Sequence, residues 1–177
     1  MDDSFKEKLF SNRIVVIEGE IDAGTASNVI SQLLILSDQN SSAPIRIYMA
    51  TSCRFYTDAM AIYDVMMSLP NPLEGFVIGC VGGYALALIA GCTKGRRYML
   101  KNSELDFIEP MVFLKPGVQQ TETLIEVQET KEEREALEKV LSFHTGRSLE
   151  EIQKAIDDNE IFTAEEAVKF GLVDKVI

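Results

Sequence analysis

The hydrophobic pattern of the first hundred or so residues alternates between two periods. Short apolar runs rich in β-branched residues predict strands, whereas apolar residues three and four positions apart predict helices. The expected strands are residues 13–19, 45–49, 73–78, 97–100 and 105–108. The expected helices are residues 26–37, 56–68 and 83–92. Because strands and helices alternate at intervals of about thirty residues, the pattern predicts parallel β-α-β units and an α/β fold.

Residues 121–143 depart from this pattern and predict one long helix. Both ends of this segment carry apolar residues, but its middle, 128–135, has none. A helix whose middle has no apolar stripe does not bury its whole length against a core. We therefore expect this helix to project from the body of the protein, the alternative being a surface helix that packs only by its ends.

Two capping boxes predict the last helices. Ser148 with Glu151 opens a helix at 149–156, and Thr163 with Glu166 opens another at 164–170. Gly171 ends the second of these, and a final strand is expected at 172–177.

No linker or internal repeat divides the chain. The sequence therefore predicts a single domain over residues 1–177. We expect a head formed by about 1–120 and 145–177, and the projecting helix at about 121–143.

Composition narrows the classes of function. The net charge of −11 argues against a nucleic-acid partner, and the one basic cluster, 94–97, is interpreted as a solvated turn. No apolar run reaches the ~18 residues of a membrane span, and no signal peptide is recognised. With one histidine and three cysteines that lack metal-ligand spacing, the sequence predicts no metal site. It also has no glycine-rich phosphate-binding loop, so no cofactor is predicted. We expect a cytoplasmic or organelle-interior protein.

The stretch 79-GCVGGYALALIAGCTKGRR-97 is a glycine-rich turn that leads into a buried helix, a common place for a catalytic nucleophile. It contains no serine. The only histidine, His144, is expected to be exposed near a helix end. Cys53 beside Arg54 is a candidate thiolate, with an unreactive loop cysteine as the alternative.

Several stretches together resemble the proteolytic subunits of Clp proteases. They are 61-AIYDVM-66, 94-KGRRYMLKNSE-104, 143-FHTGRSLEEI-152 and 163-TAEEAVKFGLVDKVI-177. The resemblance runs from residue 12 to about 110 and resumes after a small insertion near 111–118. It implies a ClpP/crotonase-like spiral of β-α-β units, in which residues 121–143 form the projecting "handle" helix. It also implies heptameric rings that stack face to face into a tetradecamer through the handles.

The same resemblance places the catalytic positions of this serine protease family. The nucleophile position is Gly83, the histidine position is Ile108 and the aspartate position is Asn159. The oxyanion-hole glycines are replaced by Cys53 and Arg54. With the triad lost and the oxyanion turn altered, the chain resembles the inactive ClpR subunits, a pseudoenzyme within the family.

The resemblance further implies partners. The chain would assemble with itself or with ClpP-type paralogues, and could dock a Clp AAA+ ATPase. The family's hydrophobic docking pocket maps to Tyr48, Phe76, Ile78, Tyr98 and Leu100. Arg46 replaces an aromatic residue there, which weakens the expected docking. The sequence starts close to its first strand, and the family's N-terminal axial-pore loop is missing from it, through truncation or by nature, which argues against substrate gating by this subunit.

Two alternatives remain open from the sequence. One is an active enzyme on the same fold, either a peptidase with a different nucleophile or an acyl-transfer enzyme of the crotonase type, with Glu109 as its candidate carboxylate. The other is an oligomeric adaptor unrelated to proteolysis.

Overall fold

The structure of the protein, a computed structural model, describes residues 3–110 and 120–177; the predicted insertion near 111–118 lies outside these ranges. The described residues form seven helices and seven strands. The helices are α1 (Asp3–Ser11), α2 (Ala23–Gln39), α3 (Tyr56–Ser68), α4 (Leu86–Gly91), α5 (Gln120–Thr145), α6 (Leu149–Asp157) and α7 (Ala164–Phe170). The strands are β1 (Ile14–Glu20), β2 (Ile45–Cys53), β3 (Leu73–Gly83), β4 (Arg97–Met99), β5 (Glu104–Asp106), β6 (Ile161–Thr163) and β7 (Lys175–Val176).

The main sheet has the order β1-β2-β3-β4-β7, and every pair in it is parallel. This confirms the predicted β-α-β architecture. The long strand β3 runs beside β2 over most of its length and changes its other neighbour on the way. Gly75–Val77 pair with β4, and Cys80–Gly82 pair with β5, which in turn pairs antiparallel with β6.

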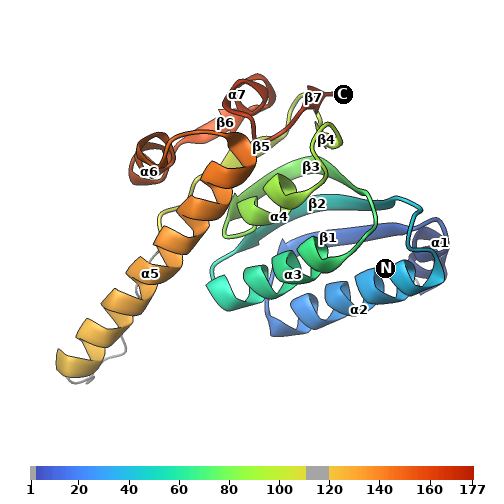
Figure 1. The fold of residues 1–177 in the computed structure, drawn as a ribbon, viewed down its shortest axis with the longest axis horizontal. Coiled ribbons are helices and arrows are strands. Elements are labelled where there is room, and N and C mark those ends of the chain that lie inside the picture. The colour runs from blue at the N-terminus through green and yellow to red at the C-terminus, as the bar shows by residue number, and fades with distance from the viewer. Residues whose placement is uncertain (1–2, 111–119) are drawn as a thin grey trace.

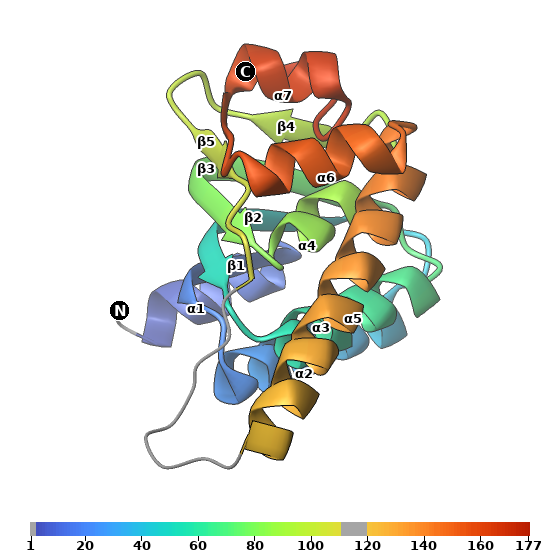
Figure 2. The same cartoon turned by 90° about the vertical axis from the view of Figure 1, so that its left-hand side faces the viewer.

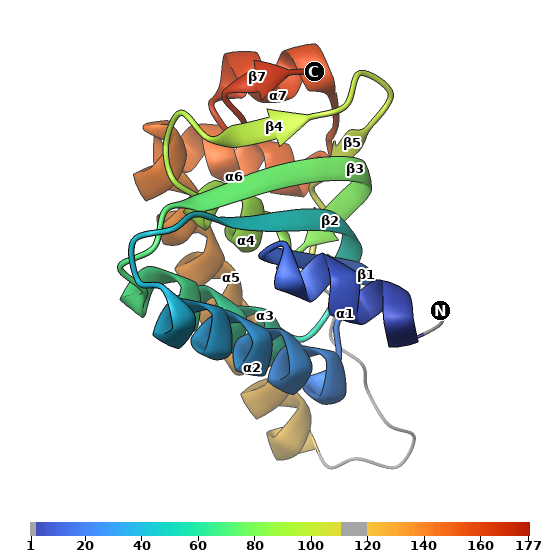
Figure 3. The ribbon, with the colours of Figure 1, turned by 90° about the vertical axis from the view of Figure 1, so that its right-hand side faces the viewer.

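Helices α2, α3 and α4 cover one face of the sheet (Figure 1). The alternation along β2 follows from this: Ile45, Ile47 and Met49 are fully buried beneath the helices, while Arg46 and Tyr48 point to the other face. On that other face, α1 crosses in front of β1 and leaves β2, β3 and β4 uncovered (Figure 3).

Helix α5 projects from the body, as the sequence predicts (Figure 2). Its C-terminal half packs on α4 and α6, with Leu137 and Leu141 buried. Its N-terminal end lies beyond the body, and Leu124 and Ile125 there are 62% and 53% exposed. The helix is therefore held by its C-terminal half rather than by both ends.

Four features differ from the sequence prediction. Helix α1 was not expected, because an isolated nine-residue helix is marginal and depends on packing against β1. Strand β3 continues through the glycines to Gly83, so α4 begins only at Leu86. Pairing on both sides, with β2 and β5, holds Val81 and Gly82 in the strand. Strand β6 was also missed, and the C-terminal strand is shorter than expected.

Candidate functional site

A small pocket lies where β2 and β3 end. It has a volume of about 110 Å³ and is lined by Ser52, Cys53, Arg54, Gly83, Tyr84, Ile108, Glu109 and Pro110. Four positions that the sequence analysis assigned to a degenerate catalytic centre therefore meet in one pocket: Cys53, Arg54, Gly83 and Ile108. The fifth, Asn159, does not line it.

The backbone at Gly83 leaves no room for a side chain. Its φ angle is +61°, a conformation that favours glycine, and a Cβ added there would lie 2.5 Å from the carbonyl oxygen of Cys53. The same oxygen accepts a hydrogen bond from the amide of Tyr84 at 3.0 Å. The pairing of Cys53 with Gly83 across β2 and β3 holds this close approach in place.

Cys53 does not have the environment of a reactive thiolate. It ends strand β2 rather than lying in a loop, and it is only 2% exposed. Its sulfur lies 3.2 Å from the carbonyl oxygen of Phe55 and 3.7 Å from that of Ile21, so the thiol is placed to donate. Burial raises the pKa of Cys53 to about 11. The side chain is therefore a protonated thiol near neutral pH.

Arg54 is paired at the rim of the pocket. Its Nε lies 3.2 Å from Oε1 of Glu20, and both side chains are substantially exposed. The guanidinium is thus directed toward β1.

Asn159 lies beside the pocket and supports its wall. Its φ angle is +47°, and its Oδ1 accepts a hydrogen bond from the backbone amide of Glu109 at 3.0 Å. The carboxylate of Glu109 in turn accepts from Nη1 of Arg134 at 3.0 Å. The one carboxylate that the sequence suggested for acyl-transfer chemistry is therefore paired with a cation.

Arg134 connects this wall to the rest of the fold. From the C-terminal half of α5 it also forms ion pairs with Glu138, at 2.8 Å, and with Asp157 at the end of α6. Glu138 is almost completely buried, and its second oxygen accepts a hydrogen bond from Gln153. One arginine thus fastens α5 to α6 and to the segment that follows β5.

A sequence profile described as Clp protease matches residues 2–177. The chain belongs to the Clp protease family. The ATP-dependent Clp protease proteolytic subunit 1 of Thermobifida fusca (strain YX) is 36% identical over 170 residues, which are 96% of this chain and 76% of that protein.

In this Clp-family chain the single histidine lies outside the pocket lining. The expected position near a helix end is confirmed, but the expected exposure was wrong: His144 lies in the last turn of α5, half-buried, and its Nε2 is 2.7 Å from the hydroxyl of Tyr63. Burial, with a smaller effect of Arg97, lowers the pKa of His144. The imidazole is therefore neutral at physiological pH and is engaged in packing α5 on α3.

The predicted basic turn is also partly buried. Arg97 is 3% exposed and binds Asp174 with both ends of its guanidinium, at 2.9 and 2.6 Å. Arg96 pairs with Glu74 at 2.6 Å. The interpretation of a solvated turn therefore fails for Arg97, whereas Lys94 is exposed and the side chain of Arg96 is 42% exposed.

The five predicted docking residues lie on the uncovered face of the sheet. Tyr48 stacks on Phe76 with ring centroids 4.6 Å apart, and Phe76 stacks on Tyr98 at 4.9 Å. This aromatic row follows the strand register directly. Ile78 lies two residues beyond Phe76 on β3 and Leu100 directly follows β4; they are 39% and 41% exposed.

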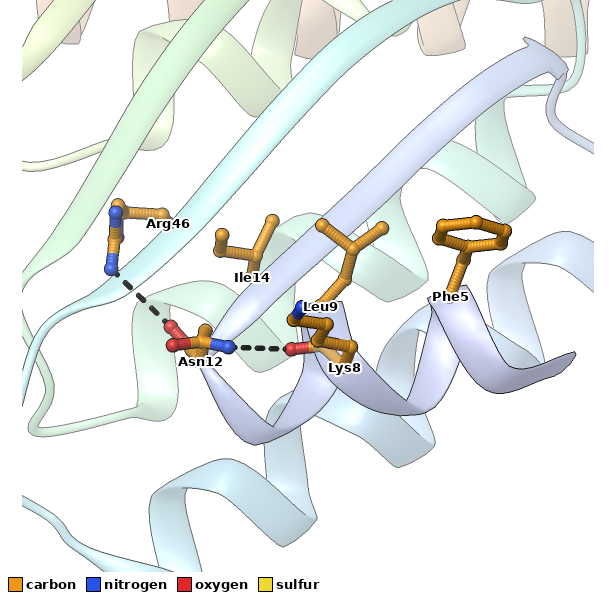
Figure 4. Close-up of a pocket in the computed structure, with 6 residues that line it drawn as sticks. All are labelled: Phe5, Lys8, Leu9, Asn12, Ile14 and Arg46. Atoms are coloured by element: carbon orange, nitrogen blue, oxygen red, sulfur yellow. Dashed lines mark hydrogen bonds between the residues drawn. The ribbon is translucent and has the colours of Figure 1, made fainter.

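A second cavity was missed by the sequence analysis because its main wall, α1, was not predicted. This groove of about 530 Å³ is lined by Phe5, Lys8, Leu9, Asn12, Ile14 and Arg46 (Figure 4). Arg46 reaches from β2 to the carbonyl oxygen of Asn12 at 3.4 Å. It therefore stands between the groove and the aromatic row.

Two features are absent from the described residues. Within residues 3–110 and 120–177, no helix is long and apolar enough to cross a bilayer. In the same ranges, no three His, Cys, Asp or Glu side chains gather in the manner of a metal site.

Proposed function

We propose that this chain is a catalytically inactive subunit of a Clp-type protease complex. The observation that carries the proposal is the backbone at Gly83. In the position where the family has its serine, the residue has no side chain, a positive φ and a carbonyl oxygen 2.5 Å from where a Cβ would stand.

The other parts of a serine mechanism are missing as well. A triad needs a base that reaches the nucleophile and an acid that orients the base. Ile108 and Asn159 occupy the corresponding positions, and neither side chain can act as a base. The only histidine in the sequence is hydrogen-bonded to Tyr63.

Retention of the scaffold supports a role in assembly. The relative's name describes a proteolytic subunit of an ATP-dependent protease. In the proposed complex, this chain takes a place in a heptameric ring, alone or with catalytic paralogues, and α5 acts as the handle between two stacked rings. The row Tyr48, Phe76 and Tyr98, with Ile78 and Leu100, would receive a Clp AAA+ ATPase, with Arg46 lowering the affinity of that contact.

Hydrolysis of a fluorogenic peptide by the purified chain at high concentration tests inactivity. We expect no turnover above background, and none in a Cys53→Ala variant. Turnover that survives purification would overturn the proposal. If that turnover were lost in Cys53→Ala, the thiol would be the nucleophile. If it were lost in Glu109→Gln, the site would be an acyl-transfer site. The raised pKa of Cys53 and the pairing of Glu109 with Arg134 argue against both outcomes.

Co-expression with a catalytic paralogue tests the assembly. We expect the two chains to elute together as a ring-sized particle. A strictly monomeric chain, with and without the paralogue, would contradict the proposal. If the chain assembles but no Clp ATPase binds the assembly, the result favours the alternative hypothesis of an adaptor unrelated to proteolysis.

A further inference from the structure

The pocket at the ends of β2 and β3 has a cation at its rim whose hydrogen-bonding capacity is largely unused. The guanidinium of Arg54 is paired with Glu20 through Nε alone, at 3.2 Å, and the two side chains are 56% and 43% exposed. Within residues 3–110 and 120–177, Nη1 and Nη2 of Arg54 have no partner. Because a guanidinium carries five N–H donors in a planar fork, one whole edge of Arg54 is available to a ligand.

The interior of the pocket carries no competing charge. Of the eight lining residues, only Arg54 and Glu109 are charged near neutral pH, since burial raises the pKa of both the Cys53 thiol and the Tyr84 hydroxyl. The carboxylate of Glu109 is bound by Nη1 of Arg134 at 3.0 Å. The pocket therefore combines an uncharged interior with a weakly paired cation at its rim.

The interior has the size of one aliphatic side chain. Its volume is about 110 Å³, and its walls include Ile108, Pro110 and Tyr84. A cavity of about 150 Å³ holds a benzene molecule, so a branched aliphatic side chain suits this smaller pocket better than an aromatic one.

We propose that this pocket binds the carboxyl end of a peptide whose last residue is aliphatic. The last side chain occupies the uncharged interior, and the terminal carboxylate accepts two hydrogen bonds from the free edge of Arg54. A planar guanidinium matches a carboxylate in this bidentate way. Carboxylate and side chain are attached to the same Cα atom, as a pocket with its cation at the rim requires. An internal peptide segment has no carboxylate at this point and is therefore disfavoured.

Glu20 is the competitor that such a ligand meets. An exposed ion pair contributes little to stability, because water solvates both partners well. The pair with Glu20 uses Nε, so a ligand can bind the opposite edge of Arg54 or replace Glu20 at little cost. Since the contact consists of one side chain and one carboxylate, we expect a weak complex, with a dissociation constant on the order of 0.1–1 mM.

The ligand class is that of the products of peptide hydrolysis. Each hydrolysis adds water across one peptide bond, which leaves one fragment with a new terminal carboxylate and the other with a new amine. In the proposed complex, this chain would hold the carboxyl ends of fragments that catalytic paralogues release. That role rests on the proposed function, whereas the binding itself rests on the pocket alone.

Fluorescence anisotropy with a matched pair of peptides tests the proposal. Both peptides carry an N-terminal fluorophore and end in leucine, one as the free acid and the other as the amide. We expect the free acid to bind the purified chain about tenfold more tightly than the amide. A terminal phenylalanine should weaken binding of the free acid, and Ile108→Ala, which enlarges the pocket, should reduce that difference. Equal binding of acid and amide, or binding of neither, overturns the proposal.

Three variants assign the preference to Arg54. Arg54→Gln should bind acid and amide equally, and Glu20→Gln should bind the acid about two- to fivefold more tightly, because the competing carboxylate is gone. Arg96→Gln makes the same change of charge at an exposed pair that does not line the pocket, so it should match the wild type. Circular dichroism confirms that each variant is folded. A preference for the acid that survives in Arg54→Gln contradicts the proposal.

Chromatography of the peptides after titration separates this inference from the proposed function. Intact peptides with a preference for the free acid support both. Cleaved peptides would mean that the proposed inactivity is wrong, whatever the preference. Intact peptides with no preference would leave the inactive-subunit proposal standing and would mean that the assignment of the pocket is wrong.

Discussion

The carbonyl oxygen of Cys53 lies 2.5 Å from the place where a Cβ on Gly83 would stand. A side chain at position 83 would therefore not fit without a shift of the backbone. The end of the pairing between β2 and β3 holds this approach, and the Cys53 oxygen accepts the amide hydrogen of Tyr84. The backbone on this side of the pocket therefore suits glycine.

Gly83→Ser should consequently not create a protease. The new side chain would meet the Cys53 oxygen and would also occupy a positive φ, which costs about 1–2 kcal/mol for a residue with a Cβ. We expect no peptide hydrolysis and a loss of about 3 kcal/mol or more in the free energy of unfolding. Fluorogenic peptide hydrolysis and urea unfolding at fixed protein concentration measure the two effects.

Gly146→Ser is the matched control for this variant. Gly146 also has a positive φ, of +76°, but no atom lies within 4 Å of an added Cβ. It should show only the cost of the backbone conformation, about 1–2 kcal/mol. Equal losses in the two variants would mean that the approach of Cys53 to Gly83 relaxes at little cost.

Arg134 should be a main support of α5. Arg134→Met would leave the almost fully buried carboxylate of Glu138 without its cation and would release Glu109 and Asp157. Removing one partner of a buried pair costs about 3–5 kcal/mol, reduced here because Arg134 itself is partly exposed. We expect faster amide hydrogen exchange in the C-terminal half of α5 and in α6.

Two further variants define the role of Arg134. The double variant Arg134→Met/Glu138→Met should regain much of the lost stability, because it leaves no buried charge unpaired. Lys154→Met, which breaks the exposed pair with Asp158, should have little effect. If Lys154→Met lost as much free energy of unfolding as Arg134→Met, the burial of Glu138 would not explain the effect of Arg134.

The ion pair of Arg97 with Asp174 should contribute to stability in a pH-dependent way. Burial alone would raise the pKa of Asp174, but hydrogen bonds from the side chain and backbone of Arg97 lower it below its usual value. The stabilisation is therefore complete above the unfolded pKa of about 3.9 and is lost as the pH falls through the lower folded pKa.

Asp174→Asn should cost about 3–5 kcal/mol at pH 7, because Arg97 stays buried without its partner. The difference from wild type should shrink as the pH approaches 3. Urea unfolding at both pH values checks this. Glu74→Gln, at the more exposed pair with Arg96, is the control, and we expect it to cost less than about 1 kcal/mol. An Asp174→Asn loss as small as that of Glu74→Gln would contradict the expectation.

The sequence predicted what depends on local pattern. The period of the apolar residues located the β-α-β units, and Ser148 and Thr163 located two helix starts whose capping boxes form as expected. Pairing between distant segments was not predictable in this way. The place of Val81 and Gly82 within strand β3 comes from β2 and β5 on either side, and helix α1 depends on β1.

The same distinction applies to the site. Resemblance to the family identified Gly83 and Ile108, which the fold brings into one pocket, but it gave no sign that Arg134 would bind Glu109. Partners separated by 25 residues or more leave no local signal in the sequence. For the same reason His144 was expected to be exposed, although Tyr63, 81 residues earlier, covers it.

The burial of His144 against Tyr63 predicts a second pH dependence of stability, at higher pH than the one that arises from Asp174. Burial lowers the pKa of His144 below its unfolded value of about 6.5, so protonation favours the unfolded chain. The stability that depends on neutral His144 is complete above pH ~6.5 and is lost as the pH falls through the folded pKa. Wild type should therefore lose thermal stability between pH 7.5 and 5 more steeply than His144→Asn, which has no imidazole to protonate.

Tyr63→Phe separates the hydrogen bond from burial. It removes the hydroxyl that lies 2.7 Å from Nε2 but keeps the ring that covers the imidazole. Because burial is the larger cause of the lowered pKa, Tyr63→Phe should be less stable than wild type at pH 7.5 by about 1 kcal/mol and should keep most of the pH slope. Thermal unfolding of the three proteins at fixed concentration measures both quantities. An equal slope of thermal stability against pH in wild type and His144→Asn would mean that another group titrates. Loss of this slope in Tyr63→Phe would mean that the hydrogen bond, rather than burial, keeps His144 neutral.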